Sequence, residues 1–160
     1  MNLKKILKTS LFLILLTSLS ACGFKVVNKS NLSGFSILEL TYEGEKKINY
    51  NLRNKILFVS SAKNQNKIKL NLNTDKKKRI KEKNIKNEVT KYQITILTII
   101  EIEFIGNRKP EVFKVSKTGD YNVHEQYSQT LNKEKKLINI LTEKIAEDIL
   151  EELSLILDAV

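Results

Sequence analysis

The chain has 160 residues, a formal net charge of +10 at pH 7, one cysteine and one histidine. That length is sufficient for one domain with a hydrophobic core. A single cysteine excludes a disulfide within the chain, and a single histidine excludes a metal centre built on several histidines. The excess of lysine indicates anionic partners, although a chain this rich in Lys, Asn and Ile is also typical of an AT-rich genome.

The N-terminal residues have the layout of a bacterial lipoprotein signal peptide. Three lysines precede a short apolar run at residues 11–16, and Leu19-Ser20-Ala21-Cys22 has the form of a lipobox. Small side chains fit the cleft of the signal peptidase, and the thiol accepts a diacylglyceryl group. The alternatives are a membrane anchor or a plain secretory signal, but the run is shorter than the roughly 20 residues that span a bilayer. We therefore predict that residues 1–21 are removed and that Cys22 is lipidated.

The mature chain would have 139 residues and a formal charge of +7, because three lysines leave with the signal peptide. Residues 25–34 are polar and turn-rich, and we predict that residues 22–34 form a lipidated tether. Gly23 follows the cysteine, which favours the outer membrane under the sorting rule of Gram-negative bacteria. We expect a protein anchored there by its lipid, on the periplasmic side. An exported protein meets no nucleic acid, so its anionic partners would be lipid head groups, lipopolysaccharide or acidic protein surfaces.

Apolar periodicity predicts the first three elements of the folded part. Residues 35–42 are predicted to form a strand that is buried on much of both faces. Apolar residues at helical spacing predict a helix over residues 45–60. Strict alternation over residues 67–73 predicts a half-exposed strand.

A strongly basic segment follows, and it is the main candidate binding site. We predict a long basic loop here, with a helix as the alternative. Such a loop could neutralise the phosphates of lipid A, whereas the competing interpretation is a solvated loop made basic by codon usage. A second, weaker candidate is the pair Arg108 and Lys109 at a hairpin tip. The candidate ligand-binding residues of the basic segment are Lys76, Lys77, Lys78, Arg79, Lys81 and Lys83.

The remaining elements complete one domain over residues 35–160. Residues 89–104 alternate over sixteen positions, and a strand of that length is expected to bend, to carry a bulge or to project past the core. Residues 106–110 predict a hairpin turn, and the return strand that follows is interrupted at residues 118–120. Residues 133–158 predict a long amphipathic helix with Asn132 as its N-cap. The simplest α+β arrangement of the order β-α-β-β-β-α is one sheet with both helices on one face.

Catalytic chemistry has little support in this sequence. His124 lies in an alternating stretch without a partner nucleophile, and we expect it to be a solvated or hydrogen-bonded strand residue. The chain has no glycine-rich phosphate loop and no nucleophile elbow. The acidic residues of the last helix are expected to lie on its solvent-exposed face: Glu143, Glu147, Asp148, Glu151 and Glu152. We expect a protein that is not an enzyme and has no cofactor apart from the lipid on Cys22.

Three short segments, together with the order of elements, carry a resemblance to a known family. They are Cys22-Gly23-Phe24, Leu52-Arg53-Asn54 and Tyr121-Asn122-Val123. With them the chain resembles the LptE family of lipopolysaccharide-assembly lipoproteins. It departs from the family at Val26 and Asn28, where members often have a proline and a nearby tyrosine.

The resemblance implies a four-stranded mixed sheet carrying two helices. It also implies a plug inside the LptD β-barrel of the outer membrane, which assists assembly of the barrel and contacts lipopolysaccharide. The alternative is a free-standing periplasmic lipoprotein that binds an anionic envelope ligand through residues 76–86. A third reading, a hydrolase with an unrecognised site, is the least supported.

Overall fold

The computed structural model describes residues 35–60, 67–106 and 108–158. The elements are β1 (Ser36–Gly44), α2 (Lys46–Val59), β2 (Lys67–Lys83), β3 (Val89–Phe104), β4 (Glu111–Asn122) and α3 (Tyr127–Asp158). This confirms the predicted order β-α-β-β-β-α. The predicted signal peptide, Cys22 and the tether lie outside the described residues. Neither α2 nor α3 is long and apolar enough to cross a membrane.

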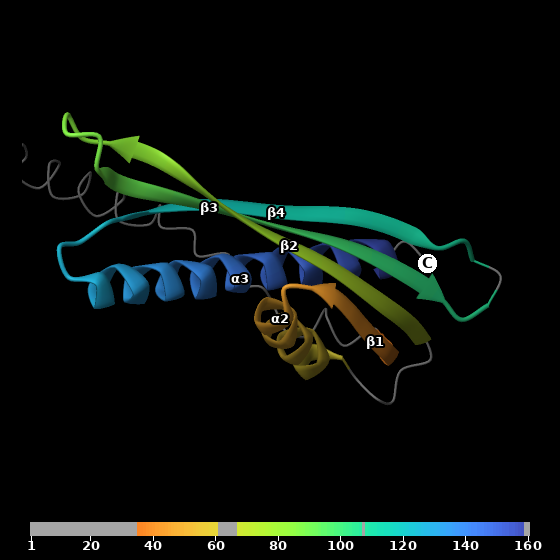
Figure 1. The fold of residues 1–160 in the computed structure, drawn as a ribbon. Coiled ribbons are helices and arrows are strands. Elements are labelled where there is room, and N and C mark those ends of the chain that lie inside the picture. The colour runs from red at the N-terminus through yellow and green to blue at the C-terminus, as the bar shows by residue number, and fades with distance from the viewer. Residues whose placement is uncertain (1–34, 61–66, 107, 159–160) are drawn as a thin grey trace, which may run out of the picture.

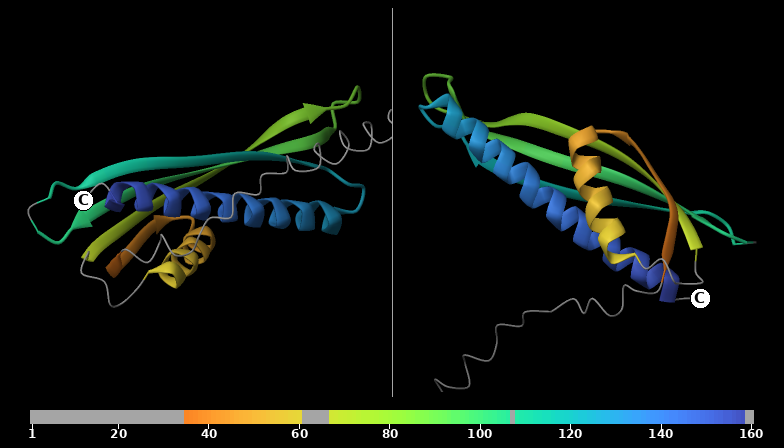
Figure 2. Two further views of the ribbon diagram at one scale, coloured as in Figure 1. Left: turned by 180° about the vertical axis from the view of Figure 1, so that it is seen from behind. Right: turned by 90° about the horizontal axis from the view of Figure 1, so that it is seen from below.

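The strands form one mixed sheet in the order β1-β2-β3-β4. β1 and β2 are parallel, because α2 carries the chain back between them, whereas β2, β3 and β4 pair antiparallel. Both helices lie on the same face of the sheet, and α3 runs along its length (Figures 1 and 2). At 1.5 Å per residue the 32 residues of α3 extend about 48 Å, which suits the long strands that it covers. We call the other face, which neither helix covers, the open face.

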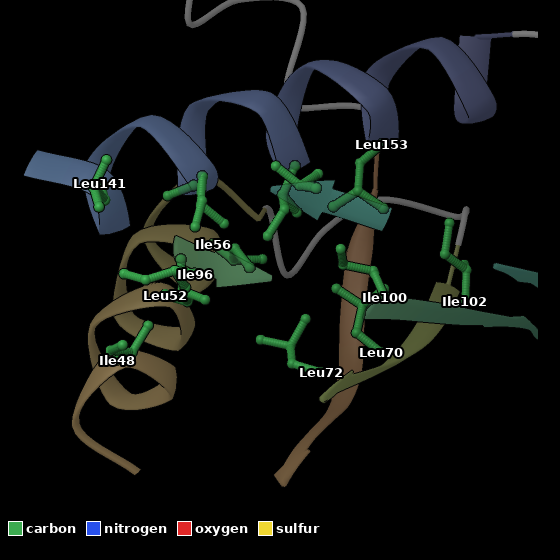
Figure 3. Packing of buried hydrophobic residues seen from close by; sticks show 14 of the residues in the cluster. Ile48, Leu52, Ile56, Leu70, Leu72, Ile96, Ile100, Ile102, Leu141 and Leu153 are labelled. Carbon is green, nitrogen blue, oxygen red and sulfur yellow. The ribbon is translucent and has the colours of Figure 1, made fainter. Parts of the chain in front are cut away.

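The core lies between the sheet and the two helices (Figure 3). Every second residue points into it along β2 as far as Thr74 and along β3 from Ile94 to Ile102, and both helices contribute residues three or four apart. Burial of each such side chain contributes about 1.5–3 kcal/mol relative to exposure, so these stripes hold the helices on the sheet. The fully buried members include Ile48, Leu52, Ile56, Leu72, Ile94, Ile96, Ile100, Ile102, Ile145, Ile149 and Leu153.

One polar pair lies within this core. Thr74 of β2 and Thr98 of β3 oppose each other in the antiparallel register, and both side chains are buried. Their hydroxyl oxygens are 3.0 Å apart, so each satisfies the other. Such close side chains indicate that the two residues form a pair that exchanges no backbone hydrogen bonds.

The prediction that the first strand is buried on much of both faces is wrong. Leu38 is 52% exposed and Tyr42 is 39% exposed. β1 lies at the edge of the sheet and has a single neighbouring strand, so its side chains have fewer neighbours than those of β2 and β3. Apolar side chains in an edge strand therefore do not indicate burial on both faces.

The predicted interruption of the return strand is also wrong, because β4 is continuous through Gly119. A Cβ atom on Gly119 would lie 2.7 Å from Cδ1 of Leu137 on α3. Glycine at this position thus permits the close approach of helix and strand, and it does not mark a turn.

The last helix begins earlier than predicted. α3 starts at Tyr127, so Asn132 lies within the helix and is not its N-cap. The hydroxyl of Thr130 accepts a hydrogen bond from the backbone N–H of His124 at 2.9 Å and donates one to the carbonyl of His124 at 3.3 Å. These bonds hold the tight turn between β4 and α3, and they involve residues that the apolar pattern does not mark.

Candidate binding surface on the basic ribbon

The basic segment is a strand, and its prediction as a long loop is wrong. β2 continues to Lys83, and its residues 75–83 pair with residues 89–97 of β3. We call these two stretches and the turn between them the basic ribbon. Its outer end diverges from α3 (Figure 1). Ile80 is the one apolar residue of β2 here, but Ile94 and Ile96 lie opposite Lys78 and Lys76, so β3 supplies the apolar half of these pairs.

Five of the six candidate residues divide between the two faces of the sheet, and the sixth, Lys83, lies at the end of β2 beyond a shift in the pairing. Lys76 and Lys78 continue the alternation of Leu70 and Leu72 and lie on the helix face. Lys77, Arg79 and Lys81 lie on the open face. The pairing of β2 with β3 shifts between Ile80 and Lys83, opposite residues 89–92, which confirms the irregularity expected in the strand of residues 89–104.

On the helix face Lys78 belongs to a compact cluster, which we call the Tyr–Lys–Glu cluster: Lys78, Tyr92, Tyr121 and Glu134. The ammonium of Lys78 lies 4.4 Å from the ring centroid of Tyr92 and 2.6 Å from Oε2 of Glu134. The hydroxyl of Tyr121 donates to the same oxygen at 2.6 Å, and the two tyrosine rings stack with centroids 5.7 Å apart. This cluster joins β2, β3 and β4 to the first turns of α3.

The electrostatics of the cluster favour its charged pair. Burial disfavours the charged form of Lys78, but hydrogen bonds to Glu134 and Tyr121 outweigh burial and raise the pKa of Lys78. Burial likewise opposes the charge on Glu134, yet the bonds from Lys78 and Tyr121 lower the pKa of this carboxyl. Burial and then the bond to Glu134 raise the pKa of Tyr121. The charge of Lys78 is therefore largely compensated within the chain, as is that of Lys76, which lies 3.4 Å from Glu45.

On the open face the cations have less compensation. Lys77 lies 3.6 Å from Asp75 in an exposed pair, and Lys81 forms an ion pair with Asp120. The bond from Lys81, followed by one from Gln93, lowers the pKa of Asp120. The hydrogen-bond partners of Arg79 and Lys83 are neutral: Gln93 at 2.7 Å and Asn87 at 2.9 Å. Arg79 and Lys83 therefore keep their charge available to an anion.

The second candidate pair lies at the opposite end of the sheet. Arg108 follows β3, and its guanidinium donates to Glu111 at 2.6 Å and to the carbonyl of Ile156 at 3.2 Å. It also lies 4.0 Å from the ring centroid of Phe104. Arg108 thus joins the turn between β3 and β4 to the end of α3, and only Lys109 is exposed.

The residues considered for catalysis are not gathered. His124 lies in the turn between β4 and α3, so its prediction as a strand residue is wrong. Glu143, Glu147, Glu151 and Glu152 are exposed on α3, and Asp148 pairs with Lys117 at 2.6 Å. In residues 35–60, 67–106 and 108–158, no group of three or more His, Cys, Asp or Glu could hold a metal ion. The prediction that the chain is not an enzyme stays a prediction.

The carboxylate partners of the basic residues could not be predicted from the local sequence pattern. Glu134 is 56 residues from Lys78, and Asp120 is 39 residues from Lys81. The one feature of the sequence that points to this cluster is a tyrosine near the start of β3 and another near the end of β4, Tyr92 and Tyr121, which pair across the two strands.

This fold, a four-stranded mixed sheet with two helices on one face, is similar to that of solved bacterial lipoproteins. No family model matches the sequence, and no curated protein matches it. Among solved structures, the fold is similar to that of an uncharacterized lipoprotein B from Nitrosomonas europaea (TM-score 0.59, 14% identity, 86% of this chain and 94% of that chain). It is also similar to the rare lipoprotein B from Shewanella oneidensis (TM-score 0.53, 14% identity, 72% of this chain and 93% of that chain). Each likeness covers nearly the whole of the other protein.

Proposed function

We propose that this chain is an outer-membrane lipoprotein that plugs the lipopolysaccharide-exporting β-barrel LptD and helps it to assemble. In this proposal it is held on the periplasmic side by the lipid on Cys22, has no other cofactor and catalyses no reaction. The observation that carries the proposal is the conjunction of a lipobox with a fold shared by lipoproteins of the rare lipoprotein B type.

The surface of the folded part supports a role inside a polar lumen. The open face carries Lys69, Asn71 and Asn73 on β2 and Glu101 and Glu103 on β3. The lumen of a large outer-membrane barrel is polar, so a surface of this composition could pack there with its charges solvated or paired. Replacement of Lys67, Lys69 and Asn71 together by Glu should weaken association with the barrel if the open face contacts its wall.

The basic ribbon supports contact with lipopolysaccharide. Arg79 can bind a phosphate with two N–H groups, and Lys83 adds a point charge on the same strand. Exposed charges of this kind are screened beyond about 10 Å at 0.1 M salt, so binding should weaken steeply as salt is added.

The proposal is tested by affinity purification of the tagged, lipidated protein from outer membranes in mild detergent, with bound partners identified by mass. We expect a large β-barrel protein at one-to-one stoichiometry. Recovery of the chain alone, with the barrel present in the same membranes, would refute the plug and leave the free-standing binding module.

The contact with lipopolysaccharide has its own test. Replacement of both Arg79 and Lys83 by Glu should reduce retention of purified lipopolysaccharide, whereas Lys109→Glu at the far end of the sheet should not. Equal retention by the two variants would show that the basic ribbon is not the binding surface.

A further inference from the structure

The outer part of β2 has an edge that no strand occupies. β1 pairs with β2 only as far as Gly44 and Thr74. Gly44 has a φ of +86°, and a Cβ atom there would lie 2.0 Å from the carbonyl oxygen of Thr74, so glycine allows the chain to turn away at this point. Beyond Thr74, and among the described residues, β2 pairs with β3 alone.

The backbone groups at this edge can be identified from the hydrogen bonds beside it. The carbonyl of Thr74 accepts from the N–H of Glu45 on the β1 side, whereas the carbonyl of Lys67 accepts from Ile105 on the β3 side. The N–H and C=O groups of successive residues alternate in direction along a strand. The backbone N–H and C=O groups of the even-numbered residues of β2 therefore point away from β3. The N–H and C=O groups of Lys76, Lys78 and Ile80 therefore line the unoccupied edge, which we call the free edge.

Charge determines which strand fits the free edge. Lys76 and Lys78 flank it on the helix face, and Lys77, Arg79 and Lys81 flank it on the open face. A second copy of this chain would bring lysine against lysine, which is unfavourable between neighbouring strands. On the helix face Glu45 and Glu134 already pair with Lys76 and Lys78. A strand with Asp or Glu on the open face would meet the cations Lys77, Arg79 and Lys81 there.

β2 already accepts such a strand along its first half. β1 lies against residues 67–74, and Glu39 of β1 forms an ion pair with Lys69 of β2 at 3.3 Å. The outer edges of β1 and β4 lack the excess of positively charged side chains that β2 has. β1 carries Glu39 and Glu43, and β4 alternates Lys114 and Lys117 with Glu111 and Asp120.

We propose that the free edge of β2, from Lys76 to Ile80, binds an extended acidic segment of a partner protein by β-strand addition. The segment continues the line of β1 across about five residues, or roughly 17 Å. Main-chain hydrogen bonds supply the pairing, and acidic side chains on the open face supply the selectivity. This binding requires only the folded part of the chain and does not depend on the proposed barrel.

The probe is an acetylated, amidated heptapeptide of sequence Thr-Glu-Val-Glu-Val-Glu-Thr carrying a fluorophore. Its binding to the full, membrane-extracted protein in mild detergent is followed by fluorescence anisotropy, and amide hydrogen exchange is measured by NMR. We expect slowed exchange at Lys76, Lys78 and Ile80, while the already paired Lys77 and Arg79 change little. A peptide N-methylated at alternate residues has the same charge but lacks donors along one edge, and it should bind much more weakly.

Lys77→Glu is the matched test on the protein, because its side chain is 82% exposed and the substitution should leave the fold intact. Loss of one favourable cross-strand pair and gain of a repulsive one should weaken binding by about threefold or more. Lys109→Glu should bind normally. Equal binding of the N-methylated peptide would mean attraction by charge alone, and would overturn strand addition. Absence of binding, or self-association of the protein through this edge, would overturn the proposal as well.

Discussion

The Tyr–Lys–Glu cluster makes a strong prediction about stability. Two hydrogen bonds of 2.6 Å, from Lys78 and Tyr121, end on one oxygen of Glu134. Loss of a partner from a charged hydrogen bond costs about 1.5–3 kcal/mol. Lys78 is 37% exposed, so water recovers part of this energy. We expect Glu134→Ala to lower the free energy of unfolding by about 2 kcal/mol.

The assay is urea unfolding followed by circular dichroism. The slope of the free energy against urea should be unchanged and the midpoint should fall. Glu134→Gln retains an acceptor oxygen without its charge and should lose about 1 kcal/mol.

The matched control is Glu143→Ala on the same helix. Glu143 pairs with Lys55 at 3.3 Å, but both side chains are exposed, at 57% and 44%. An exposed pair of this kind contributes about 0.5 kcal/mol or less. If Glu134→Ala lost no more stability than Glu143→Ala, the cluster would not hold the basic ribbon to α3 and the reasoning would be refuted.

Two further predictions concern pH and the buried hydroxyl pair. The lowered pKa of Glu134 means that its contribution to stability is present above the ordinary carboxyl value of 4.5 and is lost as pH falls through the lowered pKa. The raised pKa of Lys78 places the corresponding alkaline loss above 10.5, and Glu134→Ala should flatten both limbs in unfolding measured across pH. Thr74→Val leaves the hydroxyl of Thr98 buried without its partner and should cost about 1–3 kcal/mol in thermal or urea unfolding. The double replacement by Val should recover part of that loss, and a simple sum of the two single losses would contradict the pairing.

The long apolar elements could be predicted from the sequence because their periodicity reports burial directly. Residues 89–104 alternate over their whole length, and β3 has those bounds. The helix expected at residues 45–60 is α2, with bounds one residue shorter at each end. The antiparallel hairpin of β3 and β4 also follows from its turn.

The basic strand could not be predicted in this way. Its regularity depends on pairing with β3, and two of its lysines, Lys78 and Lys81, pair with carboxylates that lie far away in the sequence. Alternation of apolar residues is the signal for a strand, and residues 75–83 contain Ile80 alone. The identities of the candidate site residues were therefore available from composition, but their division between two faces was not.

The continuity of β4 and the start of α3 depend on tertiary contacts, which the local pattern of apolar residues does not report. Gly119 resembled a break, but its role is to admit Leu137 of α3. The start of α3 depends on hydrogen bonds of Thr130 to His124, which precede the apolar stripe.

The central claim, a folded body enclosed by a barrel, is tested most directly by photo-crosslinking in intact cells. A photoreactive amino acid is placed singly at Asn73 on the open face, at Lys47 on α2 and at Glu147 on α3, all three exposed. Enclosure predicts that all three positions crosslink to the same large outer-membrane protein, although they lie on opposite faces of the molecule. Crosslinks from one face only, or from none, would contradict enclosure and indicate a lipoprotein that works outside the barrel.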